Sequence, residues 1–376
     1  MTRRHLARAL IAPLLLAIPS AAFAHGDIDM DRPWWTWWQY SPEIVLGLFF
    51  AGWIYGRGIA RGATSEVWRH IAFYGGLAAL ALALLSPIEP LADHVFAIHQ
   101  IEHMLLRTVG PLLLLLSAPQ AALMRGLPDW LRRPVVQPMV ASPGVRGVFG
   151  FLSRPPVATF LFLFVTYFWM WPSWHDIAIL NEPIHYMWHV SLLLSGLLFF
   201  SVLLDPRPAP AGPGIGARLV MFWLAAMGNI LLGAFLSFKS GQLYHAYDAV
   251  GRFWLSPASD EQIGGLTMWI PGTMMFAMAA LVVLYRWGKD EGRSDERRQR
   301  LGTSEAHAAA LLLKRQRSNR VLAIGLGSFA VLVLTVAIGA AAAYEHELAP
   351  SAPHAHAISS GRASPSAPQP MSASSR

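Results

Sequence analysis

Long runs of apolar residues, separated by short polar segments, alternate along most of the chain. A helix that crosses the hydrocarbon core of a membrane needs about 20 mostly apolar residues, and eight runs approach that length. We place these predicted spans near residues 42–57, 68–86, 95–117, 156–172, 184–204, 217–237, 263–285 and 321–343. The pattern predicts an all-α fold: a polytopic membrane helical bundle of about seven core spans, with a C-terminal eighth span.

The composition supports an integral membrane protein. Hydrophobic residues make up 54% of the 376 residues and charged residues only 14%, which differs from the mixed composition of a soluble protein. The net charge of +7 could suggest nucleic-acid binding, but the distribution of that charge fits membrane topology better. We therefore expect a membrane-embedded protein with no nucleic-acid partner.

The first residues have the pattern of a cleaved secretory signal. Three arginines precede an apolar stretch, and small residues around Ala24 form a cleavage site. We divide the chain into a signal peptide (1–24), an exported aromatic-rich N-terminal segment (25–41), a seven-span membrane core (42–287), a charged cytoplasmic connector (288–320), the eighth span (321–343) and a disordered exported tail (344–376).

The basic residues favour one orientation in the membrane. If the mature N-terminus is exported, the four loops assigned to the cytoplasm contain 3, 5, 2 and 10 Lys and Arg residues, whereas the exported segments contain 5 of the total of 29. Cytoplasmic loops of membrane proteins carry an excess of Lys and Arg. The bias predicts a multi-pass protein of the bacterial inner membrane, with the mature N-terminus and the C-terminal tail on the periplasmic side.

Two His-x-x-x-His pairs, His99/His103 and His185/His189, lie at the start of the third and fifth predicted spans. Residues four apart share one face of a helix, and in the assigned orientation both spans begin at the outer face. Two imidazoles at this spacing can bind one metal ion. One shared site and two separate sites are both compatible with the sequence, as are interfacial histidines that hydrogen-bond to carbonyl groups.

Two ionisable residues, Glu102 and Arg107, lie equally deep in the third span. Such residues normally face the interior of a bundle and pair there, so Glu102 should accept a hydrogen bond from an imidazole or contact Arg107. The chain has no cysteine, which excludes thiolate ligands. Imidazole with nearby thioethers suits copper, Cu(I) in particular, although methionine is also ordinary core filler. The nearby methionines are Met104, Met187, Met268, Met274 and Met275.

A last polar signal is Asp260 at the start of the seventh span, where an acidic residue suits the helix dipole. Gly264 and Gly265 permit close helix packing, and Pro271 should kink the span. Both a capped, tightly packed helix and a functional role fit this segment. The sequence does not assign roles to His25, which would become the first mature residue, to His175, to His245 or to the tail histidines.

Three motifs in this order resemble the CtaG family of cytochrome c oxidase assembly factors, which are multi-span membrane proteins. The resemblance covers roughly Pro42 to Trp287. Two departures are Glu102 and Trp188, where the family pattern has Gln and an acidic or aliphatic residue. The motifs are His99-x-x-x-His103-x-Leu105 with Pro111 and Ser117-Ala118-Pro119; His185-x-x-x-His189 with Ser195-Gly196-Leu197-Leu198-Phe199; and Asp260-x-Gln262-x-Gly264-Gly265-Leu266-x-Met268-Trp269-x-Pro271-Gly272.

The resemblance implies a non-enzymatic role in maturing a haem–copper oxidase, by supplying copper to its buried copper-B centre. Copper would bind at the outer face to both histidine pairs, and the expected partners are an oxidase subunit and an exported copper donor protein. Three alternatives remain: a membrane cytochrome with bis-histidine haem, a metal or proton transporter in which Glu102, Arg107 and the histidines form a relay, and a scaffold that binds oxidase subunits.

Overall fold

The computed structural model describes residues 32–63, 66–207 and 211–300, and in the C-terminal region residues 320, 324, 327, 328, 330–332, 334–344 and 346. The predicted signal peptide, most of the connector and most of the tail lie outside these residues. The described residues form helices joined by turns and contain no strand, which confirms the all-α prediction.

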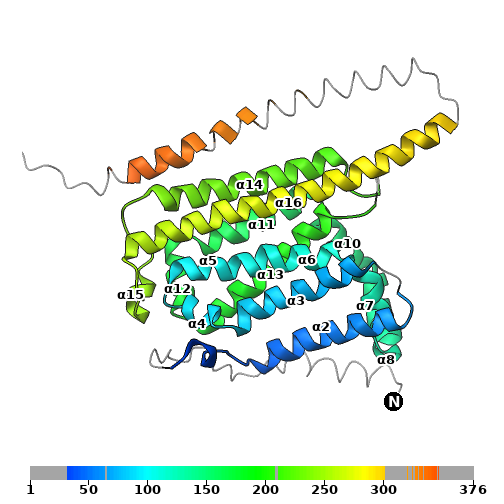
Figure 1. Cartoon of the computed structure of the whole chain (residues 1–376), viewed down its shortest axis with the longest axis horizontal. Coiled ribbons are helices and arrows are strands. Elements are labelled where there is room, and N and C mark those ends of the chain that lie inside the picture. The colour runs from blue at the N-terminus through cyan, green and yellow to red at the C-terminus, as the bar shows by residue number, and fades with distance from the viewer. Residues whose placement is uncertain are drawn as a thin grey trace, which may run out of the picture.

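Seven long helical segments among the described residues form the bundle (Figure 1), and each predicted core span falls on one of them. The segments are α2 (Pro42–Ala60), α3 (Val67–Leu85), α5 (Phe96–Met104) continued by the π-helical turn η2 (Leu105–Val109) and α6 (Gly110–Leu116), α11 (Pro155–Trp169), α13 (Glu182–Leu203), α14 (Ile215–Phe238) and α16 (Pro257–Arg300).

Five of these helices, α2, α3, α13, α14 and α16, are long and apolar enough to cross a membrane. The count rises to seven if two bent pairs each form one span. One pair is Phe96–Leu116 with α7 (Gln120–Gly126), bent by 79°, and the other is α10 (Pro143–Leu152) with α11, bent by 71°. A shorter apolar helix, Ala330–Tyr344, lies where the eighth span is predicted.

Short helices occupy the two ends of the bundle (Figure 1). At one end lie α4 (Ile88–Ala92), α12 (Pro172–Ile179) and α15 (Ala246–Val250), and α5, α13 and α16 all begin at this end. The other end carries α7, α8 (Asp129–Leu131) and α10. The remaining short elements are η1 (Trp34–Thr36), η3 (Arg132–Val136) and α9 (Gln137–Ala141).

Glycines allow two close contacts between the long helices. A Cβ at Gly265 of α16 would lie 2.7 Å from the carbonyl oxygen of Gly233 on α14. A Cβ at Gly196 of α13 would lie 2.1 Å from the carbonyl oxygen of Arg107 in η2. Only glycine permits backbones to approach this closely. The second contact holds α13 directly against the helix that carries His99 and His103.

Candidate metal centre

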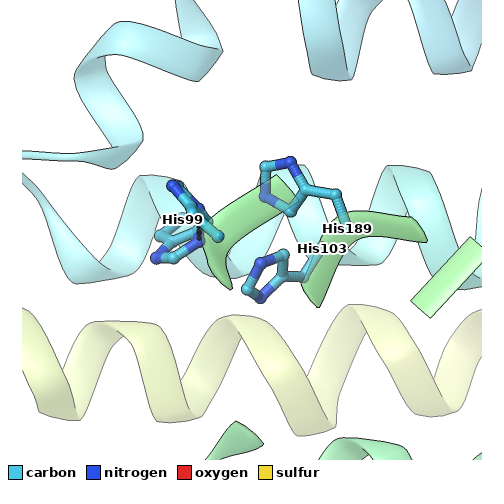
Figure 2. A group of neighbouring side chains, drawn as sticks. His99, His103 and His189 are labelled. Carbon is cyan, nitrogen blue, oxygen red and sulfur yellow. Dashed lines mark hydrogen bonds between the residues drawn. The ribbon is translucent and has the colours of Figure 1, made fainter. Parts of the chain in front are cut away.

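The two predicted histidine pairs converge on one space between α5 and α13. One ring nitrogen from each of the four lies within 4.8 Å of every other, and all four side chains are buried. Figure 2 shows the imidazoles of His99, His103 and His189 gathered in this space. We call His99, His103, His185 and His189 the four-histidine cluster. The structure therefore brings together the pairs that the sequence leaves as one site or two.

The spacing within the cluster fits a shared ion. His99 Nε2 and His185 Nε2 lie 3.2 Å apart. Two nitrogens that each bind one tetrahedral ion at 2.0–2.1 Å are roughly 3.3 Å apart. Because the set as a whole extends to 4.8 Å, it is more open than a closed tetrahedral cage.

Helical geometry supplies each pair, and the turn after His103 is unusual. The ring centroids are 4.0 Å apart for His99 and His103 and 4.4 Å apart for His185 and His189, as expected for residues four apart on one face. Immediately after His103 the helix widens into the π-helical turn η2. Single π-helical turns are frequent at functional sites.

Two buried carboxylates lie beside the second histidine pair. Glu102 Oε1 is 3.4 Å from His189 Nε2, and Asp93 Oδ1 is 3.7 Å from His185 Nδ1. A carboxylate behind an imidazole orients the ring and raises its basicity as a ligand. Of the two partners predicted for Glu102, the structure places an imidazole beside it, but neither Glu102 oxygen accepts a hydrogen bond among the described residues. Asp93 carries no helical-spacing signal and is not predicted from the sequence.

Arg107 pairs with polar groups on other helices. Its guanidinium donates to Thr166 Oγ1 and, at 2.8 Å, to Asn229 Oδ1, and it lies 4.6 Å from the ring centroid of Phe162. All of these contacts are buried. A charged group at this depth is expected to be enclosed by partners, and here the partners are neutral.

A small cavity of about 30 Å³ adjoins His103 and Arg107, which is enough for one water molecule. Among the described residues, Gln100 Nε2 and His103 Nε2 are buried without a hydrogen-bond partner, and both residues line this cavity. Three thioethers also line it, those of Met104, Met170 and Met268. Met104 and Met268 are among the methionines predicted from the sequence, whereas Met170 is not.

The other methionines named from the sequence do not share this position. Met187 is 55% exposed and Met274 is 67% exposed, so neither belongs to the buried surroundings of the cluster. Trp188, by contrast, is buried and forms a wall of the site, with its ring 4.9 Å from that of His99 and 4.4 Å from that of His103.

Asp260 caps a different helix from its own. Its two carboxylate oxygens accept hydrogen bonds from the backbone N–H groups of Phe96 and Ala97, each at 2.9 Å, and it forms an ion pair with Arg252. The first N–H groups of a helix have no partner within that helix. Asp260 on α16 therefore fixes the start of α5, the helix that carries His99.

The Tyr247 hydroxyl joins two buried histidines. It lies 2.7 Å from His99 Nδ1 and 3.0 Å from His175 Nε2. Burial lowers the pKa of His175 to about 3 and raises the pKa of Tyr247, so at neutral pH the imidazole is neutral and the phenol is protonated. His175 thus contacts the site indirectly, whereas His245 is exposed and His25 lies outside the described residues.

Acidic side chains hold the segment that carries Tyr247. Glu261 accepts hydrogen bonds from the backbone N–H groups of Leu243 at 3.0 Å and Tyr244 at 2.8 Å. Asp176 accepts one from the backbone N–H of Ala246 at 3.2 Å. The sequence offered no signal for Tyr247, because its segment lies between spans and has no periodic pattern.

Comparison with known proteins gives one family match and several distant relatives. A family model described as cytochrome c oxidase caa3 assembly factor matches residues 47–290. An uncharacterized protein of Mycobacterium leprae (strain TN) is 24% identical over 284 residues, covering 70% of this chain and 41% of that protein. Uncharacterized proteins of Mycobacterium bovis and Mycobacterium tuberculosis are each 26% identical over 285 residues, covering 72% of this chain and 42% of each protein. The chain thus spans less than half the length of these relatives. No solved structure matches it significantly.

Proposed function

Because this chain belongs to the cytochrome c oxidase caa3 assembly factor family, we propose that it binds one copper ion at the four-histidine cluster and delivers it to the copper-B centre of a haem–copper oxidase subunit. The observation that carries the proposal is the gathering of four buried imidazole nitrogens within 4.8 Å. In this role the chain is a metallochaperone and has no catalytic residues.

The donor set favours Cu(I). All four ligands are neutral imidazoles, the chain has no cysteine, and thioethers line the adjoining cavity. Soft and borderline donors of this kind suit copper rather than hard cations. A bound cation would favour ionisation of the buried Glu102 carboxyl, whose negative charge would then offset that of the ion in a low-dielectric interior.

The open ligand set suits an ion that must be released. A closed tetrahedral cage is typical of structural metal sites, whereas sites that exchange ligands keep an open position. We place the cluster near the periplasmic face on the basis of the Lys and Arg bias between loops. An exported donor protein would load the ion from that side.

The alternatives fit the geometry less well. Imidazoles whose nitrogens lie 3.2 Å apart leave no room for a haem macrocycle between them. A cation transporter needs coordinating groups that continue along the bundle, but the next ionisable group after His103 is the cation Arg107. A scaffold that only binds oxidase subunits gives no reason for four buried imidazoles to converge.

Metal analysis of the purified full-length protein tests the proposal. The wild type should bind about one copper per chain, and the double variant His103→Ala/His189→Ala should bind none at the same free copper concentration. The matched control is His94→Ala/His245→Ala, which removes two imidazoles at the same end of the bundle but outside the cluster, and it should retain copper.

The same variants test whether copper binding is required for assembly of an active oxidase. Cells with the His103→Ala/His189→Ala chain should lose oxidase activity, and cells with the control chain should keep it. Equal copper content in the two double variants would overturn the proposed site. Zinc bound in preference to Cu(I) under reducing conditions would overturn the choice of metal.

A further inference from the structure

A hydrogen-bonded series of groups behind His99 begins at a backbone carbonyl. His175 Nδ1 lies 3.2 Å from the carbonyl oxygen of Trp169. A carbonyl oxygen can only accept, so the Nδ1 of His175 carries the proton. The ring is fully buried and neutral, and a neutral imidazole has a single N–H. The other nitrogen, His175 Nε2, is therefore an acceptor.

The direction of the next two hydrogen bonds follows from the first. Tyr247 has one hydroxyl proton, and its oxygen lies 3.0 Å from His175 Nε2, so the hydroxyl donates to that nitrogen. The Tyr247 oxygen can then only accept from its other neighbour, His99 Nδ1, at 2.7 Å. His99 must carry its proton on Nδ1, which leaves a lone pair on Nε2.

That lone pair points into the cluster. His99 Nε2 is the atom that lies 3.2 Å from His185 Nε2. We propose that His175 and Tyr247 are positioning residues that fix His99 in the Nδ1–H tautomer, so that its Nε2 is always available to the metal ion. The choice of nitrogen is set by a backbone carbonyl three groups away.

The surroundings make the opposite tautomer costly. His99, His175 and Tyr247 are all fully buried, so a donor or acceptor that loses its partner there is not compensated by water. With a proton on His99 Nε2 instead, the lone pairs of His99 Nδ1 and of the Tyr247 oxygen would face each other. Phe96 packs against the Tyr247 ring at 5.9 Å and limits its movement.

Replacing one hydroxyl tests the idea, and Tyr244→Phe is a matched control for Tyr247→Phe. Tyr244 is also fully buried, and its hydroxyl donates to the Met170 carbonyl oxygen at 2.9 Å, outside the series. Both variants remove one buried hydroxyl; Tyr247→Phe loses its two hydrogen bonds in the series, and Tyr244→Phe loses one outside it. Tyr247→Phe should weaken Cu(I) binding by about 10-fold to 100-fold, measured against a competing chelator, while Tyr244→Phe should bind as tightly as the wild type.

The variant His175→Phe tests whether the whole hydrogen-bonded series, and not only the contact between Tyr247 and His99, sets the tautomer of His99. It keeps the Tyr247 hydroxyl but removes its acceptor, so the hydroxyl turns to donate to His99 Nδ1 and favours the wrong tautomer. We expect a similar loss of affinity, and no further loss in the double variant His175→Phe/Tyr247→Phe. Wild-type affinity in either single variant would overturn the proposal, as would additive losses in the double variant.

This inference rests on the proposed function only through the affinity measurement. In metal-free protein labelled with ¹⁵N at histidine, solid-state NMR should show the wild-type His99 protonated on Nδ1 alone, with its signals identified by their loss in His99→Ala. Tyr247→Phe should give a mixture of tautomers. If the wild type binds no copper, the proposed function fails and the tautomer still decides this inference. A wild-type His99 protonated on Nε2 would overturn it.

Discussion

Glu102 Oε1 lies 3.4 Å from His189 Nε2, with both side chains buried. The contact joins Glu102, which lies between the two histidines of the first pair, to a histidine of the second pair. A carboxylate in this position acts on a bound cation through its charge and on the imidazole through orientation. Without a bound metal ion, the Glu102 carboxylate has no cation to stabilise.

Glu102→Gln should therefore have opposite effects on the two states. Copper affinity should fall about 10-fold to 100-fold, because the amide is neutral. The thermal stability of the metal-free protein should be unchanged or higher, because an ionised carboxylate is costly to bury. Chelator competition and melting in detergent measure the two effects. The control is Glu66→Gln, an exposed carboxylate immediately before α3, and equal affinity in both variants would contradict the assigned role.

Asp260→Ala should destabilise the protein by on the order of 3 kcal/mol. It leaves two N–H groups at the start of α5 without their acceptor and leaves Arg252 without its buried partner. Asp248→Ala is the matched control, because Asp248 also pairs with Arg252 at 2.8 Å but is 43% exposed; its loss should cost less than about 1 kcal/mol. Denaturant titration followed by circular dichroism compares them. Similar losses would show that the cap on α5 contributes little.

Gly196→Ala should separate the two histidine pairs. The new Cβ would meet the Arg107 carbonyl oxygen at 2.1 Å, and backbone cannot move aside as a flexible side chain can. We expect a loss of about 1–3 kcal/mol in stability together with weaker copper binding. Gly47→Ala is the control, since no atom lies within 4 Å of its Cβ position. Tight copper binding by Gly196→Ala would mean that this contact does not set the geometry of the cluster.

The pH dependence of stability should show the cost of keeping the buried His175 imidazole neutral. Its pKa is about 3 in the folded protein because of burial, against 6.5 for the unperturbed group. The unfolded chain therefore takes up a proton between these values that the folded chain does not, and stability falls as pH drops from 6.5 toward 3. Thermal midpoints of metal-free wild type and His175→Phe between pH 7.5 and 4.5 test this. The wild type should show the steeper decline, and parallel curves would contradict the assignment.

The sequence predicts the long helices well because a membrane span is a local property. About 20 apolar residues suffice to define α13 or α14, whatever the rest of the chain does. The histidine pairs are likewise local, since the i, i+4 spacing alone puts His99 and His103 on one face.

What the sequence does not predict depends on contacts between distant segments. The two histidine pairs converge because Gly196 lets α13 contact the backbone of Arg107. No sequence pattern in either helix predicts that contact. Asp260 looks like a residue that caps its own helix, but it caps one that begins 164 positions earlier. Tyr247 lies in the short helix α15 and Asp93 directly follows α4, both between spans, where no periodic pattern predicts a role for a single residue.

The buried guanidinium of Arg107 limits where an ion can travel. It follows His103 by one helical turn, on the side away from the bundle end where α5 begins. A cation that moved past the cluster would meet a fixed positive charge in a medium of low dielectric constant. On the proposed function, copper therefore leaves by the end through which it entered. Its transfer would cross no membrane potential, and its direction would be set by the relative affinities of donor, cluster and acceptor.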